Sequence, residues 1–339
     1  MRHGYNSVAY QILNPGMQLW FAQGDDAVVG YVTHARTQVV AGAPVCPAER
    51  LVPVSQEFEA AAAARGERVC YFGAGDRFEH LLASSVSHAY VLLGAQPVWN
   101  PHDWDIVVRN GASLRAQIAR ARRKGVRVSE WSPGAAHEHP VLRRVLADWL
   151  TTRGLPPMHF LVEPETLGRL DDRRIFVADQ SGTPIAFLIA TPVPAQSGWL
   201  IEQWPRVRSA PNGTVELLIN EAMRAFAAAG ARYATLGLSP LSRHTSPTRA
   251  RVPAWLRYTL AWLRVHGRRF YNFDGLDAFK AKFAPMRWEP IYAIAAAPHF
   301  SPRMLYAIAC AFSNGSPGML VARALASAMQ QEWRRWRTR

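Results

Sequence analysis

The sequence predicts a mixed α/β protein built from two units in tandem. Each half of the 339-residue chain begins with strand-like hairpins and continues with a strand–helix–strand unit. A strongly basic helical segment, 113–125, stands between the halves. With 49% hydrophobic and 19% charged residues, the chain has the balance of a folded protein that is long enough for two domains.

The first half shows strand patterns on both sides of an alanine-rich helix. Gly66 follows this helix, at the position where a left-handed C-cap is common. The expected strands are 7–13, 17–23, 27–42, 68–75 and 89–99, and the expected helices are 55–66 and 76–86.

The second half repeats this arrangement. Ser181 and Gly182 predict the turn of a hairpin over 174–193. The other strands expected are 198–204, 232–239 and 289–297, and the helices expected are 139–154, 214–230, 253–267, 301–312 and 317–339. We therefore expect an N-terminal domain over 1–112, a linker helix over 113–126, a C-terminal catalytic domain over 127–300 and terminal helices over 301–339.

Composition narrows the function classes. No apolar N-terminal run and no uninterrupted run of about 18 apolar residues occurs, so neither a signal peptide nor a membrane span is expected. Cys46, Cys70 and Cys310 are widely spaced, which favours a reducing compartment and excludes a cysteine-based metal site. No HExxH or other convincing ligand set appears, so we expect no metal and no cofactor.

The net charge of +14 favours a polyanionic partner, either nucleic acid or an anionic membrane surface. The charge is densest on the helix 113–125, where Ser113 is the expected N-cap and apolar residues occupy one face. The basic face predicts a docking surface for phosphates, and a solvated linker helix is the alternative. Its residues are Arg115, Arg120, Arg122, Arg123 and Lys124.

Only three of the 39 basic side chains are lysine, and two of them stand two residues apart. Lys280 and Lys282 lie in the segment FDGLDAFKAKFAP, 273–285. A lysine ammonium is compact and its pKa shifts readily, so it is not equivalent to arginine at a reactive site. On a helix, the two lysines flank one apolar stripe, which predicts the rim of a pocket.

A second candidate segment runs from the end of strand 198–204 into helix 214–230. A strand that leads into a helix N-terminus aims free N–H groups at an anion. Acyl-CoA acetyltransferases carry an Arg/Gln-x-x-Gly-x-Gly loop here, but in this chain no second glycine follows the first, so the architecture fits and the CoA loop does not. The candidate residues are Glu202, Arg206, Arg208, Asn212, Gly213 and Glu216, with Ser239 after the next strand.

Four stretches together resemble the C-terminal catalytic region of bacterial aminoacyl-phosphatidylglycerol synthases, the multiple peptide resistance factor family. They are LRAQIARARRKGV (114–126), APNGTVELL (210–218), LGLSPLS (236–242) and FYNFDGLDAFKAKFAPMRWEPIY (270–292). The resemblance implies two tandem acetyltransferase-like (GNAT) folds joined by a basic helix. It also implies a stand-alone form without the family's multi-span flippase domain.

The resemblance further implies an aminoacyltransferase, and antimicrobial peptide resistance as its role. Members of the family move an amino acid from aminoacyl-tRNA to the hydroxyl of phosphatidylglycerol or a related lipid, without a cofactor. The implied partners are aminoacyl-tRNA and an anionic phospholipid. The implied location is the cytoplasm, with peripheral contact at the inner face of the plasma membrane.

This chemistry assigns roles to the candidate residues. A carboxylate, from Glu202 or Glu216, holds the amino acid's ammonium or helps to deprotonate the attacking hydroxyl. Lys280 or Lys282 stabilises the developing oxyanion. Arg206 and Arg208 meet the lipid phosphate or the tRNA end, and the other expected substrate contacts are Asn212, Gly213, Ser239, Tyr271, Asp274 and Arg287. The basic helix contacts tRNA.

Two other functions stay open at this point. The chain could be an acyltransferase with another activated donor such as an acyl-CoA, or a non-catalytic membrane- or RNA-binding module. The tail after 331 interleaves Trp333 and Trp336 with arginines, which predicts peripheral membrane contact. A helical pair packed on the second domain, with a frayed basic end, is the alternative for this tail.

Overall fold

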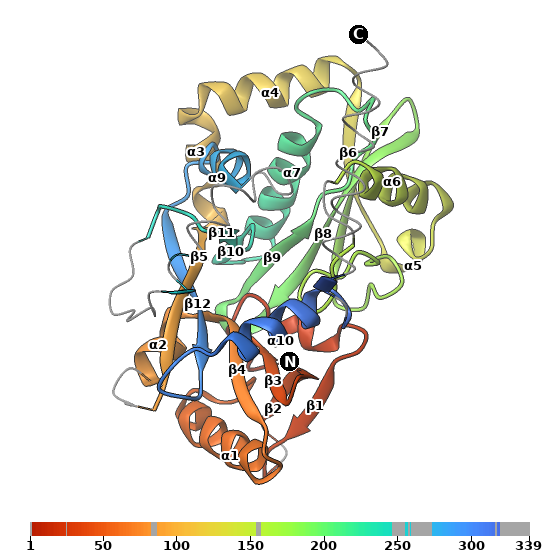
Figure 1. Cartoon of the computed structure of the whole chain (residues 1–339). Helices are drawn as coiled ribbons and strands as arrows, with labels where there is room; N and C mark the ends of the chain where they lie inside the picture. The colour runs from red at the N-terminus through yellow and green to blue at the C-terminus, as the bar shows by residue number, and fades with distance from the viewer. Residues whose placement is uncertain are drawn as a thin grey trace.

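A computed structural model describes residues 2–24, 26–82, 87–153, 157–245, 255, 256, 258, 273–315, 317 and 318. In this part of the chain one mixed sheet of 12 strands runs through the molecule, and helices cover both of its faces (Figure 1). The strand order is β1-β2-β3-β4-β12-β5-β10-β9-β8-β7-β6, and β11 pairs with β5 outside this order.

The strands are β1 (Gln18–Phe21), β2 (Val28–His34), β3 (Thr37–Ala41), β4 (Arg68–Gly75), β5 (Ala89–Trp99), β6 (Val126–Trp131), β7 (Arg174–Gln180), β8 (Thr183–Val193), β9 (Gly198–Gln203), β10 (Tyr233–Thr235), β11 (Ser239–Pro240) and β12 (Arg287–Ala295). The α-helices are α1 (Leu51–Ala64), α2 (Asp76–Leu82), α3 (Trp104–Asn110), α4 (Ala112–Arg123), α5 (Pro133–Ala136), α6 (Pro140–Thr151), α7 (Thr214–Ala228), α9 (Phe273–Ala281) and α10 (Pro302–Phe312). Short 3-10 helices are η1 (Ala9–Leu13), η2 (Ala48–Arg50), η3 (Pro101–Asp103) and η4 (Pro194–Gln196).

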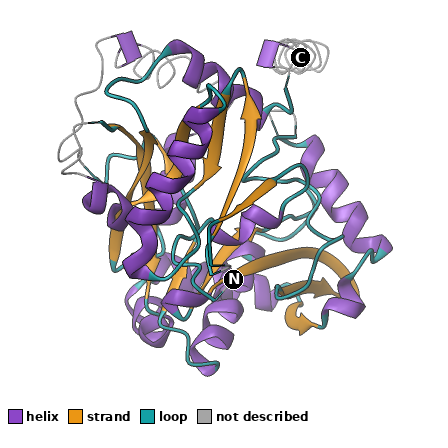
Figure 2. Cartoon of the chain, turned by 90° about the horizontal axis from the view of Figure 1, so that it is seen from below, coloured by secondary structure: helices purple, strands orange, loops and turns teal. Residues whose placement is uncertain are grey.

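Strand alternation sorts the core of the first half into two layers. Val39 and Ala41 of β3 face a cluster that includes α10 and η1. Val40, between them, faces a second cluster that includes α1 and α2. Successive strand side chains point to opposite faces, so helices are required on both sides. Figure 2 shows this layering from below.

The second half has the same layering. Phe176 and Leu188 pack with α4 and α7 on one face of the sheet. Ile175 and Phe187, their strand neighbours, pack with α5 and α6 on the other face. The mixed α/β class is thus confirmed, and the two halves share one layered arrangement, with the basic helix α4 between them in the chain.

Strand β12 ties the two halves together. It follows the lysine pair in sequence, yet it lies between β4 and β5, with Ala295 opposite both Cys70 and Ala89. The range 127–300 therefore contributes a strand to the first half. The domain boundaries 1–112, 113–126, 127–300 and 301–339 stay a prediction.

Most of the predicted elements are confirmed, including the hairpin turn at Ser181 and Gly182, and three predictions are wrong in detail. Residues 7–13 do not form a strand: from Ala9 on they form η1, whose four consecutive buried residues lack strand alternation. Residues 27–42 form two strands, β2 and β3, joined by a turn at Ala35 and Arg36, and not one strand. Helices α3 and α5 and strand β6 were not predicted. Ser113 is not the N-cap, because α4 begins one residue earlier, after Gly111. Most of helices 253–267 and 317–339 lies outside the described residues.

Gly213 allows α4 to pack directly on the N-terminus of α7. Its φ angle is +97°, and an added Cβ would lie 2.0 Å from the carbonyl oxygen of Gln117 on α4. Both the left-handed backbone and the close approach require glycine at this position. The sequence candidate Gly213 therefore has a structural role, which is to hold the basic helix against the second half.

We predict that Gly213→Ala destabilises the protein by about 3 kcal/mol or more, because it combines backbone strain with a clash against α4. Gly230→Ala is the matched control at the other end of the same helix. Gly230 also has a positive φ, +76°, but open space around the added Cβ, so it should cost only about 1–2 kcal/mol. Urea unfolding measures both, and equal losses would contradict the packing role.

Candidate functional site

Strands β9 and β10 run parallel but stay paired for only three residue pairs, ending at Leu200 and Thr235. Beyond this point β9 keeps its pairing with β8, whereas the chain after β10 stays beside β5, which β10 already pairs with, and pairs with it again as β11. We call this place the strand separation. It lies at the carboxyl ends of parallel strands, where α/β proteins commonly bind ligands.

Lys280 of α9 reaches the strand separation from the helix side. Its Nζ donates hydrogen bonds to the carbonyl oxygens of Gly237, at 2.8 Å, and Leu238, at 2.9 Å. The residue is only 2% exposed. Burial lowers the pKa of the Lys280 amine from 10.5 to about 7, and the nearby charge of Asp277 partly offsets this. A neutral amine has two N–H groups, both engaged here, and a lone pair that can take a proton.

Lys282 lies in a different environment from Lys280. It forms a close ion pair with Glu216, in the first turn of α7. Its ammonium also lies 4.8 Å from the ring centre of Phe279 and 5.4 Å from that of Phe283. The structure therefore brings together Glu216 and both lysines around α9, and it gives each lysine a different partner.

Two residues beside Lys280 were missed from the sequence. Asp277, one helical turn earlier, forms an ion pair of 3.2 Å with His244, whose ring stacks on Trp288 at 4.0 Å. The other carboxylate oxygen of Asp277 and the hydroxyl of Ser239 are buried and have no hydrogen-bond partner among the described residues. The i, i+3 spacing could have indicated Asp277, but His244 approaches only through the fold.

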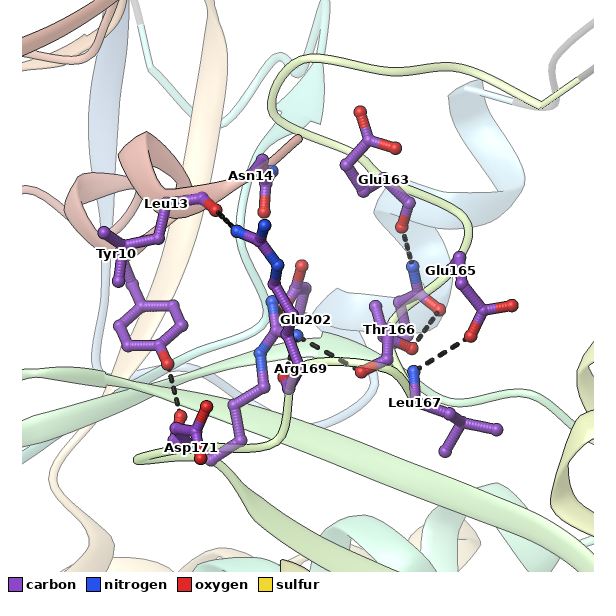
Figure 3. A network of polar contacts seen from close by, with 12 residues as sticks. Tyr10, Leu13, Asn14, Glu163, Glu165, Thr166, Leu167, Arg169, Asp171 and Glu202 are labelled. Carbon is purple, nitrogen blue, oxygen red and sulfur yellow. Dashed lines mark hydrogen bonds and ion pairs between the residues drawn. The ribbon is translucent and has the colours of Figure 1, made fainter. Parts of the chain in front are cut away.

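Glu202 is separated from the lysines by the sheet. It lies at a β-bulge of β9, since Ile189 and Ala190 of β8 stand opposite Gln203 and Ile201. Ile201 packs on the α7 side. Glu202 instead contacts Arg173, at 3.3 Å, just before β7. Figure 3 shows Glu202 among side chains of η1 and of the segment that precedes β7.

Burial raises the pKa of the Glu202 carboxyl, and this outweighs the lowering by the charge of Arg173 and by the amide of Gln11. The charge of Glu163 raises the pKa further. A carboxylate in this setting gains from any additional positive donor. Glu202 and Glu216, the two alternatives for the carboxylate role, therefore lie on opposite faces of the sheet.

The remaining substrate candidates fall into three groups. Arg206 bridges to β8 and donates at 3.5 Å to the carbonyl of Ala210, whereas Arg287 donates at 2.9 Å to Glu289. Three other candidates are exposed: Arg208, Asn212 and Asp274. Tyr271 lies outside the described residues.

The basic face of α4 is exposed, as predicted, and its apolar residues are buried against α7. Arg122 forms an ion pair of 2.7 Å with Glu221, and Arg115 donates to backbone carbonyls near the end of α3. Arg120 and Arg123 make no hydrogen bond or ion pair within the described chain. They are therefore available to an outside anion.

Within the described ranges, no three His, Cys, Asp or Glu side chains gather in a way that could hold a metal ion. No helix among the same residues combines the length and apolar character needed to cross a bilayer.

The fold and the strand separation define an acetyltransferase-like α/β protein with a buried lysine where the parallel strands part. The chain belongs to the family described as phosphatidylglycerol lysyltransferase, C-terminal, whose model matches residues 1–295. The resemblance inferred from sequence is confirmed, and with it the assignment to a transferase family.

Individual relatives agree with this family. The chain is 24% identical over 237 residues to the lysylphosphatidylglycerol biosynthesis bifunctional protein LysX of Mycolicibacterium gilvum (strain PYR-GCK), covering 62% of this chain and 19% of that protein. It thus spans about a fifth of that relative's length.

Solved structures share the fold. The C-terminal domain of a protein assigned as a lysylphosphatidylglycerol synthetase, from Agrobacterium fabrum, superposes with a TM-score of 0.78 at 21% identity, covering 93% of this chain and 95% of that one. The structure of L-PGS from Bacillus licheniformis gives 0.73 at 20% identity, covering 96% and 94%. FemX gives 0.52 at 9% identity, covering 88% and 96%.

Proposed function

We propose that this protein moves an amino acid from aminoacyl-tRNA to the hydroxyl of phosphatidylglycerol or a related lipid. The family supports aminoacyl transfer to phosphatidylglycerol. The observation that carries the proposal is the buried Lys280 amine, held by the Gly237 and Leu238 carbonyls where the parallel strands part. Aminoacyl-tRNA as the donor and the particular lipid as the acceptor are what this proposal adds to the family assignment.

The transfer exchanges one ester for another and needs no change of oxidation state. The lipid hydroxyl oxygen bonds to the aminoacyl carbonyl carbon, and its proton passes to the neutral Lys280 amine. The bond from that carbon to the tRNA ribose oxygen then breaks, and the Lys280 ammonium returns the proton to the ribose oxygen. A base whose pKa lies near the operating pH is suited to both steps.

This assignment changes the role expected for Lys280. A fully protonated lysine was expected at the oxyanion, but the low pKa of Lys280 favours a proton acceptor instead. Lys282, paired with Glu216, is the lysine that fits the oxyanion role. The buried hydroxyl of Ser239 is a further donor close by, since Ser239 follows the carbonyls that hold Lys280.

The acyl-CoA alternative is less well supported. In that case the N-terminus of α7 would face a pyrophosphate. Here the carbonyl of Gln117 on α4 packs against Gly213 at this N-terminus, and a carbonyl oxygen repels an anion. The basic side chains of α4 point outward instead, where a longer polyanion such as tRNA could follow them.

The proposed product also explains the expected peptide resistance. An aminoacyl group adds an ammonium to an anionic headgroup, so the modified membrane surface loses negative charge. Cationic peptides are attracted less strongly to such a surface. Peripheral membrane contact through the tail 331–339 remains a prediction, because the tail lies outside the described residues.

We predict that the protein, given charged tRNA and phosphatidylglycerol liposomes, produces an aminoacyl lipid, and that Lys280→Met lowers the rate by about 100-fold or more. Arg144→Met, which removes an exposed cation of α6, is the control and should keep the rate. Because Lys280 must be neutral to accept a proton, the rate should rise with pH up to about 7 and then level off. No product with any charged tRNA, or a rate that falls as pH passes 7, would contradict this.

A second prediction concerns α4. If its free arginines meet tRNA phosphates, the logarithm of the binding constant falls with the logarithm of salt concentration, and each lost contact reduces the slope by about 1. Replacing Arg120 and Arg123 with glutamine should therefore flatten the slope by about 2. The same double change at Arg143 and Arg144, on α6, should leave the slope unchanged. An unaltered slope in the α4 variant would make α4 a solvated linker.

A further inference from the structure

The polar groups around Glu202 are buried without enough partners. Neither carboxylate oxygen of Glu202 makes a hydrogen bond with normal geometry, although Arg173 lies 3.3 Å away. The Nε of Arg173 also lacks a partner within the described chain. The two side chains are only 5% and 4% exposed, so bulk water does not satisfy them. We call Gln11, Arg173, Thr191 and Glu202 the Glu202 cluster.

Gln11 and Thr191 complete this cluster. Gln11, on η1, is 0% exposed, and its amide oxygen has no hydrogen-bond partner among the described residues. Its amide lies close enough to Glu202 to lower the pKa of that carboxyl. Thr191, on β8, is also 0% exposed with an unpartnered hydroxyl. Buried polar groups are nearly always hydrogen-bonded, so three such residues together indicate a missing binding partner.

Thr191 faces the same side of the sheet as Glu202. Along β8, Leu188 and Ala190 pack on the α7 side, and Ile189 packs on the α6 side. Alternation therefore directs Thr191 to the α6 side, which is also the side of Arg173 and η1. The unpartnered atoms thus belong to one layer of the molecule.

The charges around Glu202 indicate that the missing binding partner is a cation. Glu202 and Glu163 carry negative charges that act on each other, and Arg173 is the charge that offsets them at Glu202. Glu163 also lies 3.1 Å from His159, so one negative charge is left uncompensated when both carboxyls are ionised and this histidine is neutral. A carboxylate buried in this way is stabilised by a second positive donor more than by water.

The Glu202 cluster borders the same strand separation as Lys280. Leu200 and Thr235 form the last pair of the parallel register, and Glu202 and Gly237 each stand two residues beyond it along their own segments. The carbonyl of Gly237 is one of the two that hold the Lys280 amine. The Glu202 cluster therefore borders β9, and the Lys280 amine is held by the segment that follows β10.

We propose that the Glu202 cluster binds the α-ammonium of the aminoacyl group while the ester carbonyl lies on the Lys280 side of the strand separation. An ammonium has three N–H donors. The Glu202 carboxylate, which is ion-paired with Arg173 but accepts no hydrogen bond, the Gln11 carbonyl oxygen and the Thr191 hydroxyl supply three acceptors within the described part of the chain. This inference rests on the proposed function, and it adds η1 and β8 to the residues that select the substrate.

Calorimetric titration of the full chain with alaninamide and lysinamide tests the site without any transfer. Both carry the α-ammonium and an uncleaved carbonyl, whereas propionamide lacks only the ammonium of alaninamide. We expect the two amino amides to bind and propionamide not to bind. Gln11→Leu and Thr191→Val should each weaken binding about threefold to tenfold, and Glu202→Gln about tenfold or more.

Two controls separate binding from folding. Thr37→Val removes another 0% exposed, unpartnered hydroxyl, on β3 in the first half, and it should leave the affinity unchanged. Gln11→Leu should keep or raise the melting temperature without ligand, because an unsatisfied buried amide is removed.

Equal amide affinity in wild type, Gln11→Leu and Thr191→Val would overturn the proposal, and so would binding of propionamide as strong as that of alaninamide. Failure of both amino amides to bind wild type would overturn it too. If the same preparation still transfers an amino acid to phosphatidylglycerol liposomes, the proposed function stands and only the ammonium site is wrong.

Discussion

The amine of Lys280 is bonded to the carbonyls of Gly237 and Leu238, which the parting of β10 from β9 leaves free of strand partners. A strand pair that continued would have used these carbonyls in the sheet. The break in pairing thus creates two acceptors in a buried place, and a lysine satisfies them. The surrounding elements stabilise this arrangement. The chain after β10 pairs with β5 as β11, and the ring of Phe279 on α9 stacks on that of Trp204, just after β9, with 6.0 Å between the ring centres.

The same separation divides the polar chemistry between two faces of the sheet. On one face, α7 and α9 hold Glu216, Lys282 and Lys280. On the other face, η1 and the segment before β7 surround Glu202 with Arg173. A substrate that carries an ammonium next to an ester meets different requirements at its two ends, because the ammonium needs a carboxylate and the ester needs a proton acceptor. The sheet keeps these charges from neutralising each other, since a direct pair of Glu202 with Lys280 would raise the pKa of the amine.

Local patterns predicted the elements that depend on local chemistry. The turn at Ser181 and Gly182 needs two positive φ angles, 54° and 79° in the structure, and small or flexible residues indicate it directly. The apolar stripe of the 113–125 helix likewise predicted its buried face. The strand predicted over 7–13 is wrong because this largely buried run has no strand alternation, and η1 packs Ile12 against Gly30 instead.

The site was predictable in part for the same reason. The unusual spacing of Lys280 and Lys282 is visible in the sequence, and Lys280 lies at the strand separation while Lys282 pairs with Glu216. Arg173 and Gln11 could not be assigned to Glu202, because they come from distant segments that only the sheet brings together. Nor could spacing show that Lys280 is buried and Lys282 is ion-paired, which is the difference on which their proposed roles rest.

The protonation of Lys280 can be measured directly because the chain has only three lysines. Protein labelled with ¹³C at the lysine Cε should give three side-chain signals, and Lys280→Met and Lys282→Met assign them. The account predicts that the signal missing from Lys280→Met titrates with a midpoint near 7, well below the ordinary lysine pKa of 10.5. A midpoint above 10 for Lys280 would mean that its amine is charged at neutral pH, which would contradict its role as the proton acceptor.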